Sequence, residues 1–577
     1  MLKRLASCVR EYKKNSFLAP LFVVLEVVME VIIPFMMAKL IDNGIDEGNM
    51  NYVWKMGGIL LFATFASLLF GILAGKHAAI ASSGFAKNLR RDMYYNVQNY
   101  SFSNIDKFSS ASIVTRLTTD VTNVQNSYQM LVRVAVRGPV MLIAALIMAF
   151  NVNHTISYIF LAAIPILSGG LYLIIRKAHP IFKRVFKTYD RLNCVVQENL
   201  RGIRVVKSYV REEREIKKFE EVSHDIFKDF SKAEALIAMN SPLMQFCVYS
   251  CMLFISWVGA RLIVNNTMST GQLMSLFTYT MQILMSLMML SMVLVMITIS
   301  RASAERIHEI LVEESDLKNK PEAIFEVANG EIEFEHVDFS YCNDKDKLSL
   351  IDATIKIPSG STVGILGGTG SSKSSFVQLI PRLYDAIRGS VKVAGVDVRD
   401  YDLETLRNEV AMVLQKNVLF SGTIKENLRW GNENATDEEL IHACQLAQAD
   451  EFIKNFPDQY DTYIEEGGSN VSGGQKQRLC IARALLKKPK ILILDDSTSA
   501  VDTKTDALIR QAFRNEIPNT TKIIIAQRVS SIQDADQIVV MDGGKINAIG
   551  THDELLANNS IYQEVYNSQV RGGIGNE

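Results

Sequence analysis

The first 300 residues alternate between long apolar stretches and polar segments. A stretch of about 20 apolar residues is long enough to cross a bilayer as a helix. Six such stretches occur, at Phe17–Met37, Met56–Gly75, Leu131–Phe150, Ile156–Ile175, Leu243–Val264 and Gln272–Ile299. Any one of them taken alone also fits a buried core helix. Because all six precede residue 300 and none follows it, the pattern predicts a membrane domain.

The pattern changes after the sixth stretch. Val312 to Gly330 is acidic and contains Pro321, as is typical of a linker. Beyond it, short β-rich runs alternate with helical ones, which is typical of an α/β domain with a mainly parallel sheet. The predicted organisation is an all-α transmembrane domain of six long helices, a linker and an α/β domain, at residues 1–312, 313–330 and 331–570.

The composition agrees with a chain that is half in the membrane and half in water. Hydrophobic residues make up 48% of the chain and charged residues 21%. The formal net charge is −1, which gives no reason to expect nucleic acid as a partner. The seven cysteines are scattered without a CxxC pair, so we expect them to serve packing rather than metal binding or redox chemistry.

Lysine and arginine are unevenly distributed between the apolar stretches. Asn151–His154 contains neither, and Lys39–Lys55 is dominated by acidic residues. The N-terminal segment and the segment from Arg176 to Lys232 are strongly basic. So is the segment after the second stretch, which carries Lys76, Lys87, Arg90, Arg91, Lys107, Arg116, Arg133 and Arg137. By the positive-inside rule we expect a multi-pass protein of the cell membrane, surrounded by lipid bilayer, with both termini in the cytoplasm.

The two long basic segments contain apolar residues at helical spacing, as in Phe85–Val97 and Leu192–Val210. They therefore predict cytoplasmic continuations of the membrane helices, long enough to transmit force to a domain below the membrane. Disordered linkers are the alternative.

A phosphate-binding loop follows the strand-like run Thr362–Leu366 and precedes a predicted helix. Backbone N–H groups of such a loop hold phosphates, Lys373 reaches the β- and γ-oxygens, and Ser374 ligands Mg²⁺. The glycine that normally precedes the lysine is Ser372 here. The loop reads Gly367, Gly368, Thr369, Gly370, Ser371, Ser372, Lys373 and Ser374.

Two further motifs accompany the loop. The apolar run from Ile491 to Leu494 ends in Asp495 and Asp496, the Walker B pattern, in which Asp495 holds Mg²⁺ through water. Between the phosphate loop and this strand lies the run Val471, Ser472, Gly473, Gly474 and Gln475. It resembles the ABC-transporter signature motif, with Val471 in place of the usual leucine. The combination, in this order, resembles type IV ABC exporters of the multidrug-exporter-like group. The resemblance covers nearly the whole chain.

The resemblance implies roles for several residues. Tyr341 would stack on adenine, and Gln415 would link the γ-phosphate and Mg²⁺ to the membrane arms. Glu466 would be the acid of the X-loop, and Ser499–Asp502 the D-loop. The regions Ile105–Asp120 and Glu198–Tyr209 resemble the two coupling helices. Together with Ser375, the phosphate loop and the run from Ser472 to Gln475 would bind the cofactors ATP and Mg²⁺.

Two residues depart from the family at the hydrolytic positions. The glutamate expected after the Walker B aspartate is Asp496, and the histidine expected after Lys522–Ala526 is Gln527. In this family each ATP site combines the Walker motifs of one domain with the signature motif of the other. With Ser372, three changes fall on the Walker half-site of this chain, while its signature motif stays intact. This pattern resembles the degenerate-site subunit of a heterodimeric exporter, whose partner would be a second ABC half-transporter. We expect low ATP turnover from this chain alone; a slow homodimer is the alternative.

The membrane path offers one further candidate site. Glu26 and Glu30 lie one turn apart near the middle of the first span, where carboxylates are costly and usually functional. We interpret them as a site of substrate binding or gating, with a satisfied interhelical pair as the alternative. The sixth span is rich in methionine, for which packing is favoured over substrate contact.

The leading hypothesis is ATP-driven export of amphipathic or apolar small molecules. A lipid flippase, a peptide exporter or a siderophore importer of the same fold are alternatives, as is an ATP-gated regulatory subunit that does not pump.

The uneven distribution of lysine and arginine predicts the orientation. Cysteines introduced at Gly48 and Asn153 should react with a membrane-impermeant maleimide added to intact cells, whereas a cysteine at Glu331 should not. Labelling at Glu331 from outside would reverse the topology.

Overall fold

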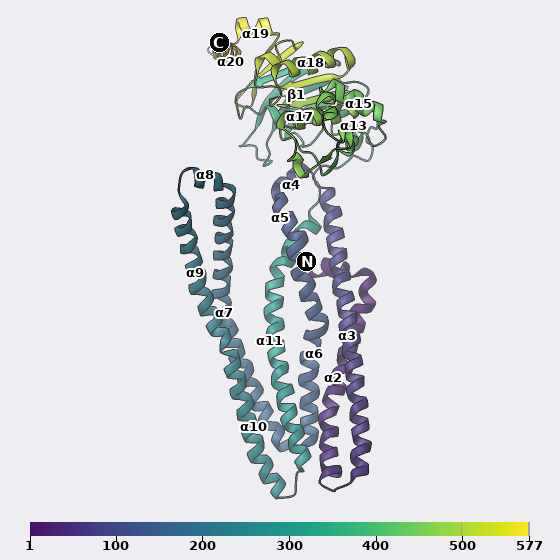
Figure 1. Ribbon diagram of the computed structural model, residues 1–577, viewed down its shortest axis with the longest axis vertical. Coiled ribbons are helices and arrows are strands. Elements are labelled where there is room, and N and C mark those ends of the chain that lie inside the picture. The colour runs from purple at the N-terminus through teal and green to yellow at the C-terminus, as the bar shows by residue number, and fades with distance from the viewer. Residues whose placement is uncertain (498, 575–577) are drawn as a thin grey trace. The chain divides into compact units, whose positions relative to one another are not determined.

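The computed structural model describes residues 1–497 and 499–574. The chain divides into two compact units (Figure 1). One comprises Met1–Gln98 and Ser110–Glu313, and we call it the membrane unit. The other comprises Asn99–Ser109 and Glu314–Glu577, and we call it the nucleotide unit.

The membrane unit is built from helices. Within the described residues, 6 of its helical segments are long and apolar enough to cross a membrane, which confirms the predicted fold class. The helices are α1 (Leu2–Ser7), α2 (Lys13–Leu40), α3 (Met50–Gln98), α5 (Ser110–Thr115), α6 (Val121–Val152), α7 (His154–Arg201), α8 (Ile203–Ser208), α9 (Glu212–Ala238), α10 (Asn240–Val264) and α11 (Thr270–Val312). Short helical turns join some of them, at Arg10–Tyr12, Ile41–Ile45 and Arg116–Asp120.

Several helices extend far beyond the membrane. Helix α3 has 49 residues and α7 has 48, which at about 1.5 Å per residue gives roughly 70 Å each. The hydrocarbon core of a bilayer is only about 30 Å thick. The predicted continuation of the spans into the basic segments is therefore confirmed for α3 and α7. Helices α7 and α9, joined by α8, form an arm of the membrane unit (Figure 1).

Small residues bring the helices of the membrane unit close together. Ala74, Ala78 and Ala81 of α3 are fully buried. A Cβ atom at Gly84 would lie 2.4 Å from the ring of Tyr12, so only glycine lets the N-terminal segment lie against α3 there. Small residues thus let neighbouring segments pack closely against α3.

Arg133 and Arg137 lie in α6, inside the predicted third span Leu131–Phe150, so they do not belong to the basic segment after the second span with which we grouped them. The guanidinium of Arg137 contacts Glu26 and Glu30 of α2. A buried charge is tolerated inside a membrane when it is paired, and the pairing explains why this arginine interrupts an apolar run.

The nucleotide unit contains a mainly parallel sheet in the order β12-β11-β3-β10-β9-β6, in which β12 is antiparallel to β11. A second, antiparallel sheet has the order β2-β1-β4-β5. The strands are β1 (Ile332–Phe339), β2 (Leu350–Ile357), β3 (Thr362–Gly367), β4 (Arg388–Val393), β5 (Val396–Asp397), β6 (Val410–Val413), β7 (Gly422–Thr423), β8 (Tyr463–Ile464), β9 (Ile491–Asp495), β10 (Thr521–Ile525), β11 (Gln537–Asp542) and β12 (Lys545–Gly550).

Helices cover the parallel sheet and form a separate cluster beside it. They are α4 (Phe102–Phe108), α12 (Lys373–Gln378), α13 (Leu403–Glu409), α14 (Ile424–Arg429), α15 (Asp437–Leu446), α16 (Asp450–Lys454), α17 (Gly473–Leu486), α18 (Thr503–Glu516), α19 (His552–Asn558) and α20 (Ser560–Ile574). Strands β3 and β9 flank β10 in parallel, so their carboxyl ends lie at the same edge of the sheet. This edge carries the candidate site.

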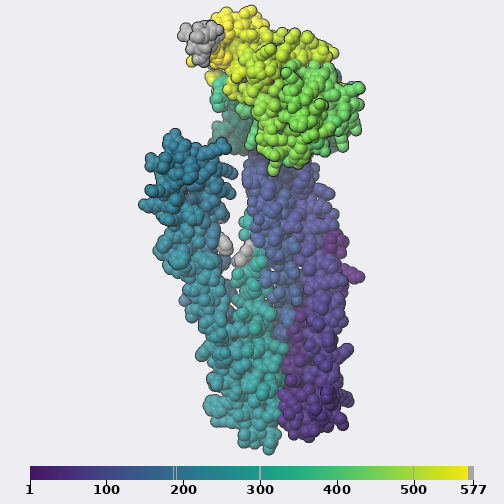
Figure 2. Space-filling view, viewed as in Figure 1, coloured from purple at the N-terminus to yellow at the C-terminus, as the bar shows by residue number. Residues whose placement is uncertain are grey.

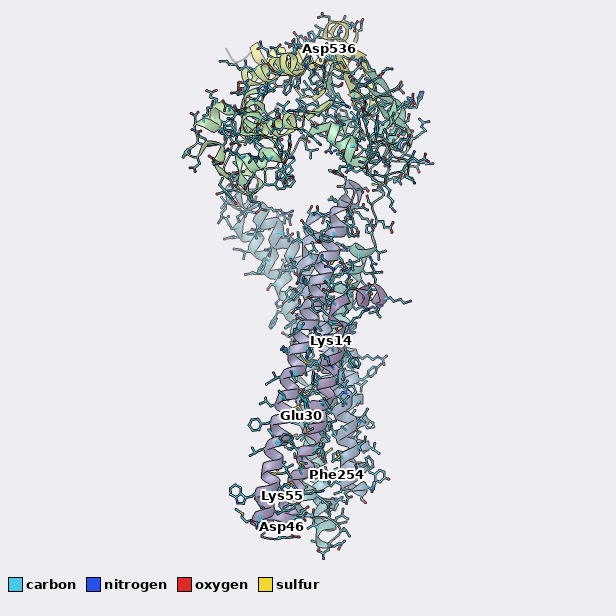
Figure 3. The ribbon with its side chains drawn as sticks, turned by 90° about the vertical axis from the view of Figure 1, so that its right-hand side faces the viewer. Lys14, Glu30, Asp46, Lys55, Phe254 and Asp536 are labelled. Carbon is cyan, nitrogen blue, oxygen red and sulfur yellow. The ribbon has the colours of Figure 1, made fainter. Side chains whose placement is uncertain are left out.

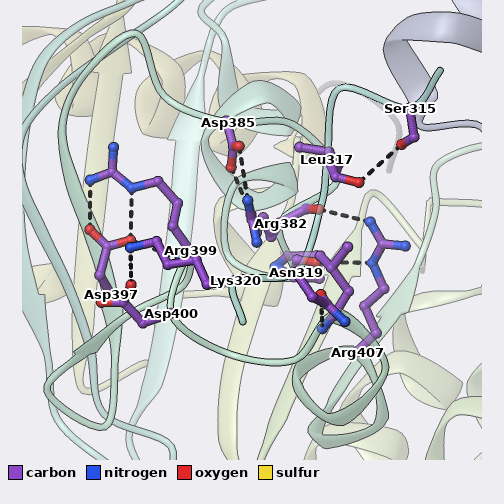
Figure 4. Close-up of polar contacts among 12 residues, drawn as sticks. Ser315, Leu317, Asn319, Lys320, Arg382, Asp385, Asp397, Arg399, Asp400 and Arg407 are labelled. Carbon is purple, nitrogen blue, oxygen red and sulfur yellow. Dashed lines mark hydrogen bonds and ion pairs between the residues drawn. The ribbon is translucent and has the colours of Figure 1, made fainter. Parts of the chain in front are cut away.

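The segment that we predicted as a linker is fastened to the nucleotide unit. The N–H of Ile324 donates to the carbonyl of Asp400 at 2.8 Å, and the N–H of Asp402 donates to the carbonyl of Ile324 at 3.0 Å. Lys320 pairs with Asp400 (Figure 4). Asn319 accepts a hydrogen bond from the N–H of Leu403. The segment is therefore an ordered strap along the β5–α13 region.

Candidate ATP site

The phosphate loop connects β3 to α12. Gly367 packs against β11, where a Cβ atom would lie 2.3 Å from the carbonyl oxygen of Met541. Gly370 has a φ of +82°, which glycine adopts without strain. Ser372, which directly precedes α12, has a φ of +70° and a ψ of 25°. An L-residue in this left-handed region is strained, which explains why the family places glycine here.

Lys373 is folded against the loop that it serves. Its Nζ atom donates to the carbonyl oxygens of Gly367 at 2.9 Å and Gly368 at 2.8 Å, and to Ser371 Oγ at 3.3 Å. Burial lowers the pKa of the Lys373 ammonium from its ordinary value. A phosphate bound at the loop would exchange these carbonyl contacts for charge-assisted ones, which are stronger.

The residues expected to hold Mg²⁺ lie together at the carboxyl edge of the sheet. Asp495 ends β9, is buried, and accepts a hydrogen bond from the side chain of Ser374. Burial raises the pKa of the Asp495 carboxyl, and the neighbouring charge of Asp496 raises it further. A hydroxyl and a carboxylate are hard oxygen ligands of the kind that Mg²⁺ takes alongside phosphate oxygens. The residues present therefore fit the ion.

No group of three or more His, Cys, Asp or Glu side chains in residues 1–497 and 499–574 is arranged to hold a metal ion.

Asp496 is held by two amide side chains. Gln527 Nε2 donates to Asp496 Oδ2 at 2.9 Å, and Gln415 forms a second side-chain hydrogen bond with the carboxyl. Burial raises the pKa of Asp496, and both amides act in the opposite direction. The structure thus brings together the two residues that the sequence placed at the hydrolytic positions, Asp496 and Gln527, with Gln415 beside them.

A glutamine of the C-terminal helix holds the segment after β10. Gln569 Nε2 donates to the carbonyl oxygen of Gln527 at 2.8 Å, and Gln569 Oε1 accepts from the N–H of Val529 at 2.9 Å. Sequence reasoning missed this residue because 40 or more positions separate it from its partners and no motif marks it.

Tyr341 follows β1 and reaches the start of α12. Its hydroxyl lies 2.9 Å from Ser375 Oγ and 3.1 Å from Gln378 Oε1. Its ring meets those of Phe339 and Tyr384 edge-on, at 4.8 and 5.2 Å between centroids, and 44% of the residue stays exposed. The exposed part leaves room for the stacking on adenine that the resemblance implies.

Tyr384 was not singled out by the sequence analysis. Its hydroxyl donates to Asp106 Oδ2 of α4 at 2.8 Å, and its ring packs against Phe102. Because it also contacts Tyr341, it connects α4, within the first expected coupling region, to the edge of the ATP site. The second expected coupling region contains α8, at the tip of the α7–α9 arm.

The signature motif lies at the exposed start of α17. Ser472 Oγ accepts from the N–H of Gln475 at 3.3 Å, and Gln475 Oε1 accepts from the N–H of Ser472 at 2.9 Å, so the two residues form a capping box. A Cβ atom at Gly474 would lie 2.8 Å from the carbonyl oxygen of Ala500, which couples the motif to the D-loop. Gly473 is exposed.

The remaining motif residues are placed as follows. Glu466 is exposed in a short helical turn at Glu466–Gly468. In the D-loop, the N–H of Ala500 donates to Gln477 Oε1 at 3.0 Å, and Asp502 caps α18. Thr498, just before this loop, lies outside the described residues.

A phosphate loop and a Walker B strand at one sheet edge, in a chain with six membrane-length helices among its described residues, define an ATP-driven membrane transporter. Family models agree: residues 16–288 match the ABC transporter transmembrane region, and residues 350–499 match the ABC transporter model. The chain belongs to the ABC transporter family.

Relatives share the full length of the chain. The uncharacterized ABC transporter ATP-binding protein YfiB of Bacillus subtilis is 36% identical over 100% of both chains. The ATP-dependent lipid A-core flippase of Desulfotalea psychrophila is 31% identical over 99% of both. A solved structure of a bacterial Atm1-family ABC exporter with ATP bound is similar in fold, with a TM-score of 0.83, 24% identity, and coverage of 97% of this chain and 99% of that one.

The left-handed conformation of Ser372 predicts that Ser372→Gly stabilises the protein by about 0.5–1 kcal/mol. Strain of about 1–2 kcal/mol is relieved, and the greater chain entropy of glycine offsets part of the gain. The midpoint of thermal unfolding of the full chain should rise. Ser371→Gly is the matched control, because buried Ser371 has no positive φ and contacts Lys373, so that change should lower the midpoint. Equal shifts in both variants would contradict the strain.

Proposed function

We propose that this chain is one subunit of a heterodimeric exporter of amphipathic or apolar compounds. Its Walker motifs form a degenerate ATP site, and its signature motif completes the hydrolytic site of the partner. The observation that carries the proposal is the contrast between two half-sites. The carboxyl of Asp496 is shortened and engaged by amides, whereas Ser472 and Gly473 are exposed at the start of α17 and Ser472 forms a capping box with Gln475.

The geometry at Asp496 opposes fast hydrolysis. An aspartate is one methylene shorter than the glutamate of the family, which draws the carboxylate back by about 1.5 Å. Misplacement of this order can cost about 10²-fold in rate. A general base also needs a lone pair aimed at the attacking water, and the hydrogen bond from Gln527 occupies Oδ2.

Gln527 provides a neutral amide where the family has a histidine. A glutamine amide donates a hydrogen bond but cannot become a cation, so it cannot neutralise negative charge on a transferring phosphoryl group. Gln569 holds its backbone in place, which keeps the side chain directed at Asp496. This half-site is thus suited to holding ATP with little turnover.

The nucleotide-binding residues would still hold ATP. Lys373 would contact phosphate oxygens, Tyr341 would stack on adenine, and Ser374 with Asp495 would hold Mg²⁺. Bound Mg²⁺ supplies positive charge that neutralises the phosphates. ATP retained here would keep two nucleotide-binding domains together, while the N–H groups of Gly473 and Gly474 would contact the γ-phosphate bound by the partner.

The membrane unit supports a partner subunit. The arm of α7, α8 and α9 exposes apolar side chains along its length, and Figure 2 shows the arm separated from the rest of the unit over part of its length. They include Val205, Tyr209, Ile216, Phe219, Phe227 and Phe230. Exposed apolar residues on a cytoplasmic extension mark an interaction surface. We propose that the second half-transporter packs against this surface.

A lipid flippase is the second candidate function. The observation that favours it is the relative from Desulfotalea psychrophila, whose name gives that activity. Reconstituted vesicles containing fluorescent lipids would distinguish the two, because a flippase moves lipid between leaflets on ATP addition, whereas a drug exporter moves a soluble dye across the membrane.

We place the protein in the cell membrane with both termini in the cytoplasm.

The asymmetry predicts opposite sensitivities in the assembled complex. Ser472→Arg should abolish ATPase and transport, because loss of contacts to phosphoryl oxygens in the partner's site costs 10²-fold or more. Asp496→Asn should leave most of both, because it changes a site that is already slow. ATPase would be measured at saturating ATP.

Assembly of each variant should be checked by gel filtration, with Glu433→Gln, an exposed residue away from both motifs, as the control. If Asp496→Asn is as damaging as Ser472→Arg, this chain's own Walker motifs perform the hydrolysis and the proposal fails.

A further inference from the structure

Arg137 of α6 lies between the two glutamates of α2. Its Nη1 atom is 2.6 Å from Glu26 Oε1, and its Nη2 atom is 2.7 Å from Glu30 Oε1 and 2.8 Å from Glu30 Oε2. Two carboxylates thus share one guanidinium. When all three side chains are ionised, the cluster has one more negative charge than positive charge.

The cluster lies deep in the first span. Glu26 is 12 residues from Lys14 and 13 from Lys39, which at about 1.5 Å per residue places it roughly 18–20 Å from either charge along α2. Figure 3 shows Glu30 between Lys14 and Asp46. An uncompensated charge at this depth is costly.

One oxygen of the cluster lacks a donor. The Glu26 side chain is only 9% exposed, and Glu26 Oε2 has no hydrogen-bond partner in the described part of the chain. Gly71 of α3 allows the approach, since a Cβ atom there would lie 3.1 Å from Glu26 Oε1. A buried carboxylate oxygen without a donor costs free energy, so the site favours a ligand that donates.

A second acceptor comes from α11. Pro34 has no N–H, so the carbonyl oxygen of Glu30 loses its helical partner. Gln282 Nε2 donates to that carbonyl at 3.3 Å, which fixes the orientation of the amide. Gln282 Oε1 is then buried without a donor among the residues described. Two acceptors near Glu30, which are Glu26 Oε2 and Gln282 Oε1, therefore lack a hydrogen-bond donor in the described part of the chain.

The other arginine of α6 does not supply the missing donor. Arg133 lies one turn away on α6, beside Gly75 of α3. No ion pair joins it to Glu26 or Glu30 in the portion of the chain that the structure describes, where Arg137 pairs with both. Its charge lies on the side of the cluster nearer Lys14 and leaves Glu26 Oε2 without a donor.

The cluster is not fully buried. The side chains of Glu30 and Arg137 are 27% and 23% exposed. Charged groups at this depth avoid lipid tails, so we expect the exposed part of the cluster to face a polar path. Beside Gln282, Met281 and Met285 are exposed and offer adaptable apolar surface.

We propose that this cluster is the binding site for the protonated amine of an amphipathic cation. The ammonium donates to Glu26 Oε2 and neutralises the excess negative charge, and the apolar body of the molecule lies against the methionines of α11. The inference rests on the proposed export function and assigns its substrate class: lipophilic primary or secondary amines rather than neutral compounds.

The test compares two ligands that differ in one charge. Monodansylcadaverine carries an ammonium, and its N-acetylated derivative does not. Binding of each to the purified complex in lipid nanodiscs would be followed by dansyl fluorescence, with empty nanodiscs subtracted. We expect the ammonium to bind about tenfold or more tightly than the amide, because a charge-assisted contact in a low-dielectric site is strong.

Glu26→Gln and Glu30→Gln should each bring this ratio close to one. Either change leaves a neutral pair of one carboxylate with Arg137, so folding should be preserved. Glu47→Gln, an exposed acid outside the cluster, is the matched control and should keep the wild-type ratio.

If the wild-type complex binds the ammonium and its acetylated derivative with nearly equal affinity, the proposal is overturned. The cluster would then be a structural ion pair that binds no amine. An unchanged ratio in both cluster variants would overturn it as well. ATP-driven transport of a neutral dye, measured on the same preparation, separates this result from failure of the proposed function: loss of cation preference with intact transport removes only the substrate assignment.

Discussion

The parallel register of β3, β10 and β9 is the constraint on which the ATP site depends. It brings the phosphate loop and the Walker B aspartates to one edge, so that the Ser374 side chain bonds to Asp495 and Gln527 bonds to Asp496. The strand interiors are buried and consist mostly of isoleucine, leucine and valine, which fix the register because a shift of one residue would turn polar ends into the core. Site geometry is thus a consequence of core packing.

The same edge is tied to more distant segments. Gln569 of α20 holds the backbone on which Gln527 stands, and Tyr384 joins Asp106 of α4 to Tyr341. Through these contacts, the C-terminal helix and α4 are connected to residues of the candidate ATP site. In the membrane unit, the corresponding constraint is charge: Arg137 and the two glutamates can occupy the first and third spans only because they pair.

Much of this could be predicted from sequence because local patterns carry it. Apolar length gave the six spans, and the spacing from Gly367 to Ser374 gave the phosphate loop. The pairing of Arg137 with α2 could not be found, because it is a tertiary contact across more than 100 residues. Tyr384 and Gln569 were missed for the same reason. The domain boundaries and the roles of the site residues stay predictions.

Vanadate trapping tests the central claim of asymmetric hydrolysis most directly. Vanadate traps ADP only where ATP has been hydrolysed, so a radiolabelled, photoreactive ATP analogue marks the subunit whose Walker motifs hold the trapped nucleotide. With this chain and its partner purified as a complex, the account predicts that vanadate-dependent label appears on the partner and not on this chain. Equal label on both subunits, or label on this chain alone, would contradict the account.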